Sequence, residues 1–130
     1  MTRARLPAED GLLATPVLFV VWAALLVAVA VIDVGAYLVA ASRAQGAADA
    51  AALAAVAADL ADPAPPHIVA RSIAGRNRAR VESCDCRAGR GRVEVEVSVP
   101  VGGLFIARVT GARRVTATAE AELVEDPVTR

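Results

Sequence analysis

The chain contains no lysine, so its 14 basic residues are all arginine. Aromatic residues make up only 3% of the sequence against a hydrophobic content of 56%, which leaves alanine and valine to supply the apolar character. Because such small side chains bury little area per residue, a domain built from them is expected to need help from a membrane or a partner. The formal net charge is zero, which gives no electrostatic reason to expect nucleic acid as a partner.

Residue sets that carry catalysis or ligand binding are missing as well. His67 is the single histidine, and with two cysteines it cannot complete a tetrahedral zinc site. No serine–histidine–aspartate set, paired-carboxylate pocket, glycine-rich phosphate loop or aromatic RNA platform is recognisable. We therefore expect no catalytic residues, no bound metal, no cofactor and no enzymatic activity.

Helix-breaking residues are scarce in the first half of the chain. Proline is absent between Pro16 and Pro63, and the only glycines between them are Gly35 and Gly46. The interval includes most of an uncharged apolar run of 22 residues, 11–32. A spanning helix needs about 20 apolar residues. We predict one very long helix that crosses a membrane at its start and then faces water or packs on partners.

The apolar run is interpreted as an uncleaved anchor. A cleaved secretory signal has a shorter apolar region, about 7–15 residues, followed by small residues at the cleavage site. Residues 40–42 offer such a site, but the apolar run before them is too long. Arg3 and Arg5 precede the run and only Arg43 follows closely, so the positive-inside rule places the N-terminus in the cytoplasm. We expect a single-pass protein of the cytoplasmic membrane with its C-terminal domain outside.

Two features of the long helix bear on its contacts. Asp33 follows the apolar run directly and is expected to be a solvated carboxylate at the outer boundary, although an ionisable residue buried there would be functional. Leu53, Val56 and Leu60 follow i, i+3, i+7 spacing and form one apolar stripe. We expect this stripe to pack on the C-terminal domain and the small-residue faces to allow close helix–helix approach.

The second half of the chain predicts a small domain that contains both helix and strand. Three prolines end the long helix, and residues 67–80 predict a second, shorter helix. Residues 81–86 look extended, and strict alternation of apolar and polar residues predicts strands over 93–99 and 115–123. Residues 104–109 form a short apolar segment that we expect to touch membrane or partner. The predicted fold class is α+β, a long helix packed on a small antiparallel sheet.

These elements divide the chain into five segments. We expect a cytoplasmic leader (1–10), a transmembrane segment (11–34), an extracytoplasmic continuation of the helix (35–62), a small α/β domain (63–124) and a tail (125–130).

The cysteines and arginines of the domain leave alternatives open. Cys84 and Cys86 outside a membrane favour a disulfide, but pairing across one residue is strained, and free thiols or intermolecular pairing stay open. The stretch from Arg71 to Arg92 holds seven arginines. A solvated face is the favoured reading, and binding of anionic headgroups or of a partner is the alternative.

The few polar residues of the long helix occur in a specific order. The segment VIDVGAYLVAASRAQGAADAAALAAVA resembles the N-terminal segment of TadE/TadG-like proteins, which are minor-pilin-like components of tight-adherence (Flp-type) pilus systems. The resemblance covers roughly residues 11–58. The matching residues, in order, are Asp33, Val34, Gly35, Tyr37, Arg43, Gln45, Ala48, Asp49, Ala50, Ala51, Ala52 and Leu53.

The resemblance also implies processing by a prepilin peptidase, which cuts after a glycine that precedes the apolar run. Gly11 and Leu12 stand at the matching position. Asp10 and Glu9 precede that glycine where a basic residue is usual, and Pro16 replaces the glutamate that many pilins carry five residues after the cut. Gly11 either marks a cleavage site or only begins an uncleaved anchor.

Together the residues and the resemblance predict a membrane-anchored, pilin-like accessory subunit of a tight-adherence pilus or related secretion apparatus. It would act by helix packing and assembly with other subunits of that apparatus, and prepilin peptidase would be a further partner. The alternative is a membrane-tethered binding module of the envelope, unrelated to pili, whose contact surface is the arginine-rich face.

Overall fold

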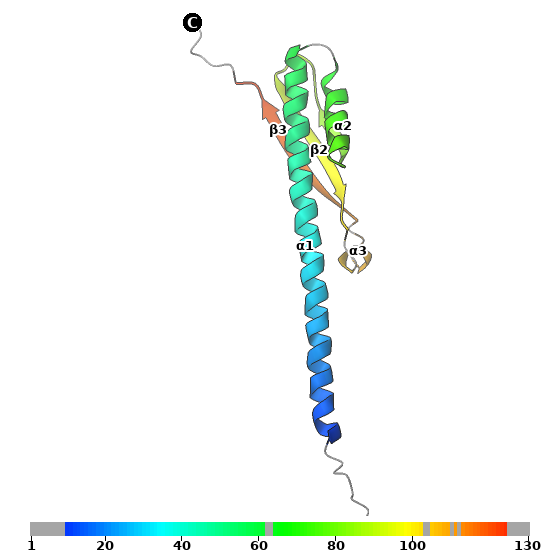
Figure 1. The fold of residues 1–130 in the computed structure, drawn as a ribbon. Helices are drawn as coiled ribbons and strands as arrows, with labels where there is room; N and C mark the ends of the chain where they lie inside the picture. Colours follow the sequence, from blue (N-terminus) through cyan, green and yellow to red (C-terminus); the bar gives the residue numbers. More distant parts are fainter. Residues whose placement is uncertain (1–9, 62–63, 103–104, 110, 112, 125–130) are drawn as a thin grey trace, which may run out of the picture.

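The computed structural model describes residues 10–61, 64–102, 105–109, 111 and 113–124. It confirms the predicted α+β class: one long helix and a small three-stranded antiparallel sheet (Figure 1). The elements in chain order are α1 (Asp10–Ala61), α2 (Pro66–Arg76), β1 (Arg80–Asp85), β2 (Arg92–Pro100), α3 (Ile106–Val109) and β3 (Arg114–Glu122).

Helix α1 is continuous over 52 residues. At a rise of about 1.5 Å per residue it is about 78 Å long. Its alanine-rich sequence has the highest helix propensity available, and Pro16 lies near its start, where a missing N–H is least costly. Most of the first half of the helix extends away from the other described elements, and only the second half lies beside the sheet and α2 (Figure 1).

The three strands pair in the order β1-β2-β3. Strand β2 lies in the centre, and its valines stand opposite small residues of β3: Val95 pairs with Ala119 and Val93 with Ala121. The register of β1 shifts between Val81 and Ser83, a β-bulge. One face of the sheet therefore carries valine and alanine, and the other carries glutamate, serine and threonine, as the alternation predicts.

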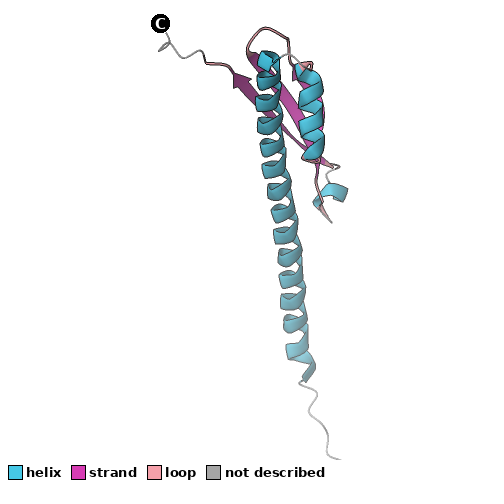
Figure 2. Cartoon of the chain, turned by 45° about the horizontal axis from the view of Figure 1, so that its top comes forward, coloured by secondary structure: helices cyan, strands magenta, loops and turns pink. Residues whose placement is uncertain are grey.

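The helices cover only the apolar face, so the domain has two layers (Figure 2). Helix α1 packs on β2 and β3, and α2 packs along α1 and against β1. The polar face is left open. Ser98 is nevertheless buried on it, and its hydroxyl is satisfied: Arg114 donates from Nε to the hydroxyl oxygen at 2.8 Å, and the hydroxyl donates to the carboxylate of Glu82.

The face of α1 that packs on the sheet is not the predicted one. Leu53 is 62% exposed and Leu60 is 69% exposed, and only Val56 of the predicted stripe is buried. The buried face consists instead of small side chains, which let the helix backbone approach the valines of β2 closely. The residues of this alanine face are Ala40, Ala44, Ala47, Ala48, Ala51, Ala52 and Ala55.

Helix α2 ends earlier than predicted, at Arg76 rather than near Arg80. Arg78 adopts a positive φ of 57°, and the amide of Ala79 donates to the carbonyl of Ala74 at 2.9 Å. The Asn77 side chain caps a further carbonyl at 3.0 Å. A left-handed residue followed by such a bond ends a helix, and here it turns the chain into β1.

Candidate functional site

The first half of α1 has the length and composition of a membrane span. Among the described residues it is the one helix with such a stretch, and only 6% of its most apolar window is buried. Its large apolar side chains are exposed from Val17 to Ile32, including Phe19 and Trp22. A helix that is apolar on all sides and uncovered by its own domain needs a lipid or protein environment.

Asp33 is buried, not solvated as expected. Its side chain is 2% exposed, and its Oδ2 accepts a hydrogen bond of 3.1 Å from the amide of Phe105. Counting in helical turns, Asp33 lies on the same side of α1 as Ala40 and Ala44. The face of the helix that carries the sheet therefore begins at this carboxylate, directly after the apolar run.

Three alanines of the predicted motif, Ala48, Ala51 and Ala52, belong to the buried alanine face, whereas other motif residues are exposed. Gly35 and Tyr37 are exposed, and so are Gln45 and Asp49. The structure brings only the last two together, with the Gln45 amide donating to Asp49 Oδ1 at 3.0 Å. A Cβ added at Gly35 or at Gly46 would meet no atom within 4 Å. Close packing within this chain therefore does not require a glycine at position 35 or 46.

The predicted processing site lies at the beginning of α1. Gly11 and Leu12 are in its first turn, and the helix runs through Pro16 without interruption. Glu9 and the preceding leader lie outside the described residues. Cleavage after Gly11 stays a prediction.

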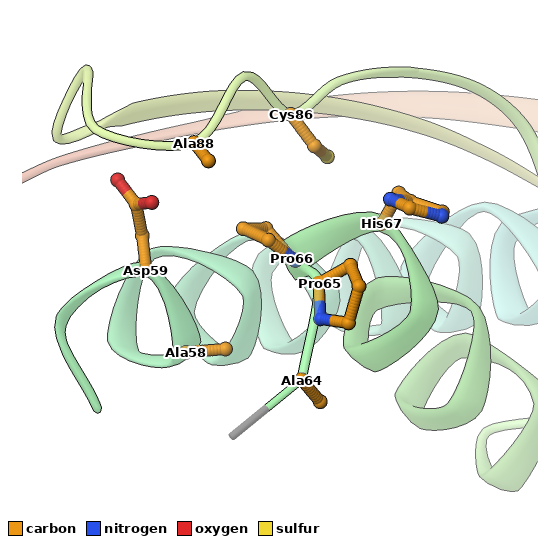
Figure 3. Close-up of a pocket in the computed structure, with 8 residues that line it drawn as sticks. All are labelled: Ala58, Asp59, Ala64, Pro65, Pro66, His67, Cys86 and Ala88. Atoms are coloured by element: carbon orange, nitrogen blue, oxygen red, sulfur yellow. The ribbon is translucent and has the colours of Figure 1, made fainter. Parts of the chain in front are cut away.

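A shallow depression separates the end of α1 from the beginning of α2 and the segment after β1 (Figure 3). Its volume is about 490 Å³, and His67, Cys86 and Asp59 line it together with small and proline residues. Asp59 is the structural centre of this region. Its carboxylate accepts the amides of Gly89 at 2.7 Å and Gly91 at 3.3 Å, which fastens the end of the long helix to the β1–β2 turn.

Cys84 and Cys86 are joined in the structure, with 5.3 Å between their Cα atoms. Both are partly buried against the core, so an apolar packing role accompanies the pairing. Whether the bond forms in the cell stays a prediction, as do the free-thiol and intermolecular alternatives. No group of three metal-binding side chains occurs among the described residues.

All seven arginines between Arg71 and Arg92 are exposed. Arg87 forms an ion pair with Asp85 at 3.1 Å, and Arg92 forms one with Glu120. Exposed pairs of this kind contribute little to stability. Of the remaining five, Arg90 lines a shallow depression of about 670 Å³ beside Leu60 and Leu123. The binding-module hypothesis built on the arginines stays a prediction.

Sequence reasoning missed two of these contacts. An aspartate next to an apolar run is expected to be solvated. In this structure the chain segment between β2 and β3 returns to Asp33 and contacts its carboxyl group. Asp59 carried no signal except its place near the helix end. Its partners are backbone amides of a glycine turn 30 residues later. Every residue except proline has a backbone amide, so the sequence does not reveal such a partner.

The arrangement defines a class of protein: a long, apolar, uncovered N-terminal helix whose second half packs on a small antiparallel sheet, the pilin-like layout. Residues 11–60 match the Flp pilus-assembly TadE/G-like family. The match confirms the predicted resemblance and associates this chain with tight-adherence pilus assembly. No curated protein and no solved structure matches the chain significantly.

Proposed function

We propose that this protein is a membrane-anchored, pilin-like accessory subunit of a tight-adherence pilus or a related secretion apparatus. One observation carries the proposal: the segment that matches the family coincides with α1, from its first turn to its last. The first half of that helix has exposed apolar side chains, and its second half packs on the sheet. Such a helix can anchor in a membrane and present a domain at the same time.

The orientation follows from the charges at the two ends of the span. Arg3 and Arg5 precede it and Arg43 follows it, so the N-terminus lies in the cytoplasm and the domain lies outside. Cysteines paired outside the cytoplasm agree with this orientation.

Assembly with other subunits occurs through the exposed side of α1. An added Cβ at Gly35 or Gly46 would meet no atom within 4 Å, and glycines allow the backbone of a second helix to come close. Leu53 and Leu60 continue the same side beyond them and offer apolar contact area. The membrane-spanning half adds its uncovered surface to this contact.

Membrane fractionation and co-isolation test the proposal. The protein should stay in the membrane pellet after carbonate treatment, because a spanning helix is not extracted; release by carbonate would contradict anchoring. Gly46→Leu should reduce the amount of other pilus subunits that co-purify. Gly75→Leu is the matched control, because Gly75 is also helical, exposed and free of neighbours within 4 Å of an added Cβ. Equal co-purification of both variants would contradict assembly through this side.

A further inference from the structure

The connection between β2 and β3 returns to the middle of α1. We call its described part, residues 101–102, 105–109, 111 and 113, the foot. The amide of Val101 donates to the carbonyl of Arg113 at 3.0 Å and closes the base of the connection. Helix α3 lies at its tip, beside α1 and well away from the body of the sheet (Figures 1 and 2).

One hydrogen bond ties the foot to the long helix. The amide of Phe105 donates to the buried carboxylate of Asp33 at 3.1 Å. Pro100 and Gly102 lie across a shallow depression of about 240 Å³ from Gly35 and Val39 of α1. Because the acceptor is a buried side chain of α1, this hydrogen bond sets the height of the foot along the helix.

That height coincides with the end of the apolar run. Asp33 follows Ile32 immediately, and 22 residues span about 33 Å of helix. The hydrocarbon core of a bilayer is about 30 Å thick. If α1 spans the membrane as proposed above, Asp33 and the foot lie together at its outer surface.

The foot exposes apolar side chains at this place. Phe105 is 62% exposed and Val109 is 75% exposed. The amide of Val109 donates to the carbonyl of Phe105 at 3.1 Å, one helical turn, so the two side chains lie on the same side of that turn. Arg108 and Arg113 are exposed in the same segment. Apolar and basic side chains together are the composition of a segment that binds in a membrane interface.

We propose that the foot is a second membrane contact, in which Phe105 and Val109 enter the headgroup region of the outer leaflet. Arg108 and Arg113 bind lipid phosphates there. The occupant is the bilayer itself, because the foot continues the exposed apolar surface of α1 at the level where that surface leaves the membrane. The second contact fixes the tilt and rotation of the sheet domain relative to the membrane, which a single helix cannot do. This inference rests on the proposed anchoring of α1.

Depth-dependent fluorescence quenching tests the contact in the full chain reconstituted into phosphatidylcholine nanodiscs. Trp22 is the only tryptophan, so the wild-type protein reports on the span alone. A Trp22→Phe background then carries one probe at a time: Phe105→Trp, or Val109→Trp as a second probe should the first variant misfold. Leu60→Trp is the control, since it is 69% exposed and lies about 40 Å further along α1. Nitroxide labels are placed on the lipid headgroup or deep in the acyl chain.

The expected pattern separates the two proposals. Trp22 should lose emission to the deep label, the probe at position 105 or 109 to the headgroup label, and the probe at position 60 to neither. Quenching of Trp22 without quenching at positions 105 and 109 would overturn the foot contact while leaving the anchor intact, as for a foot covered by a protein partner. An unquenched Trp22 would overturn the anchor itself. Adding phosphatidylglycerol should increase quenching of the foot probe, and Arg108→Gln with Arg113→Gln should abolish that increase; no increase would overturn the role of the arginines.

Discussion

Enlarging one alanine on the buried face of α1 should loosen the sheet. Ala51 is 0% exposed and lies in the core with the valines of β2. Ala51→Leu adds three carbon atoms where the helix and the sheet are already in contact. Overpacking of this kind costs about 1–3 kcal/mol, which corresponds to about a 5- to 150-fold larger population of the opened domain. The alternative, a helix that tilts away from the sheet, exposes buried valine and is no less costly.

Ala57→Leu is the matched control for this substitution. Ala57 is exposed on the same helix, and the same exchange there changes helix propensity equally. Hydrogen exchange of the β2 amides, measured by mass spectrometry on the full chain in nanodiscs, reports the opening directly. The Ala51 variant should exchange faster by the factor above, and the Ala57 variant should exchange like the wild type. Equal exchange in both variants would refute close packing through the alanine face.

Three further substitutions test single contacts by the same exchange measurement. Asp59→Ala removes the acceptor of two turn amides and should destabilise the β1–β2 turn by about 1 kcal/mol; unchanged exchange of that turn would contradict the clamp. Glu94 pairs with an acidic residue on each neighbouring strand. Glu94→Lys should therefore stabilise the sheet by about 0.2–1 kcal/mol, whereas Glu122→Lys, opposite an arginine, should not, and a gain in both would count against the register. Replacing both cysteines by serine removes a closed loop of only three residues and should cost about 1–2 kcal/mol; a complete loss of folding would show that the pairing matters far more.

The elements of this fold could be predicted because each has a strong local signal. Helix α1 has no breaker between Pro16 and Pro63, and β2 and β3 alternate strictly between apolar and polar residues. The early end of α2 was missed, because Arg78 in a left-handed conformation has no signature that a glycine in its place would have had.

The packing face of α1 could not be predicted from hydrophobicity. Leu53 and Leu60 are strongly apolar, yet they are exposed, and alanines of low individual hydrophobicity form most of the buried face of this part of α1. Side-chain size determines which face of α1 packs on the sheet. The valines of β2 fill the space between the sheet and the helix, so only small side chains of α1 fit opposite them. The exposed leucines are left for another partner.

The polar residues of the candidate site form one contact that the sequence predicts and one that it does not. Gln45 and Asp49 lie one turn apart, and their hydrogen bond follows from that spacing. Asp33 depends on Phe105, which is 72 residues away in the sequence. A contact over such a distance requires the fold of the whole domain, which neither periodicity nor the order of residues in α1 supplies.

The N-terminal sequence of the mature protein, isolated from membranes, tests the central claim most directly. A pilin-like anchor predicts a product that begins at Leu12 and keeps the whole apolar half of α1. A product that begins at Met1 or Thr2 would keep the anchor but remove pilin-type processing. A product that begins near Ser42 would lack the span and would contradict the account, because α1 would then be only the support of a released domain.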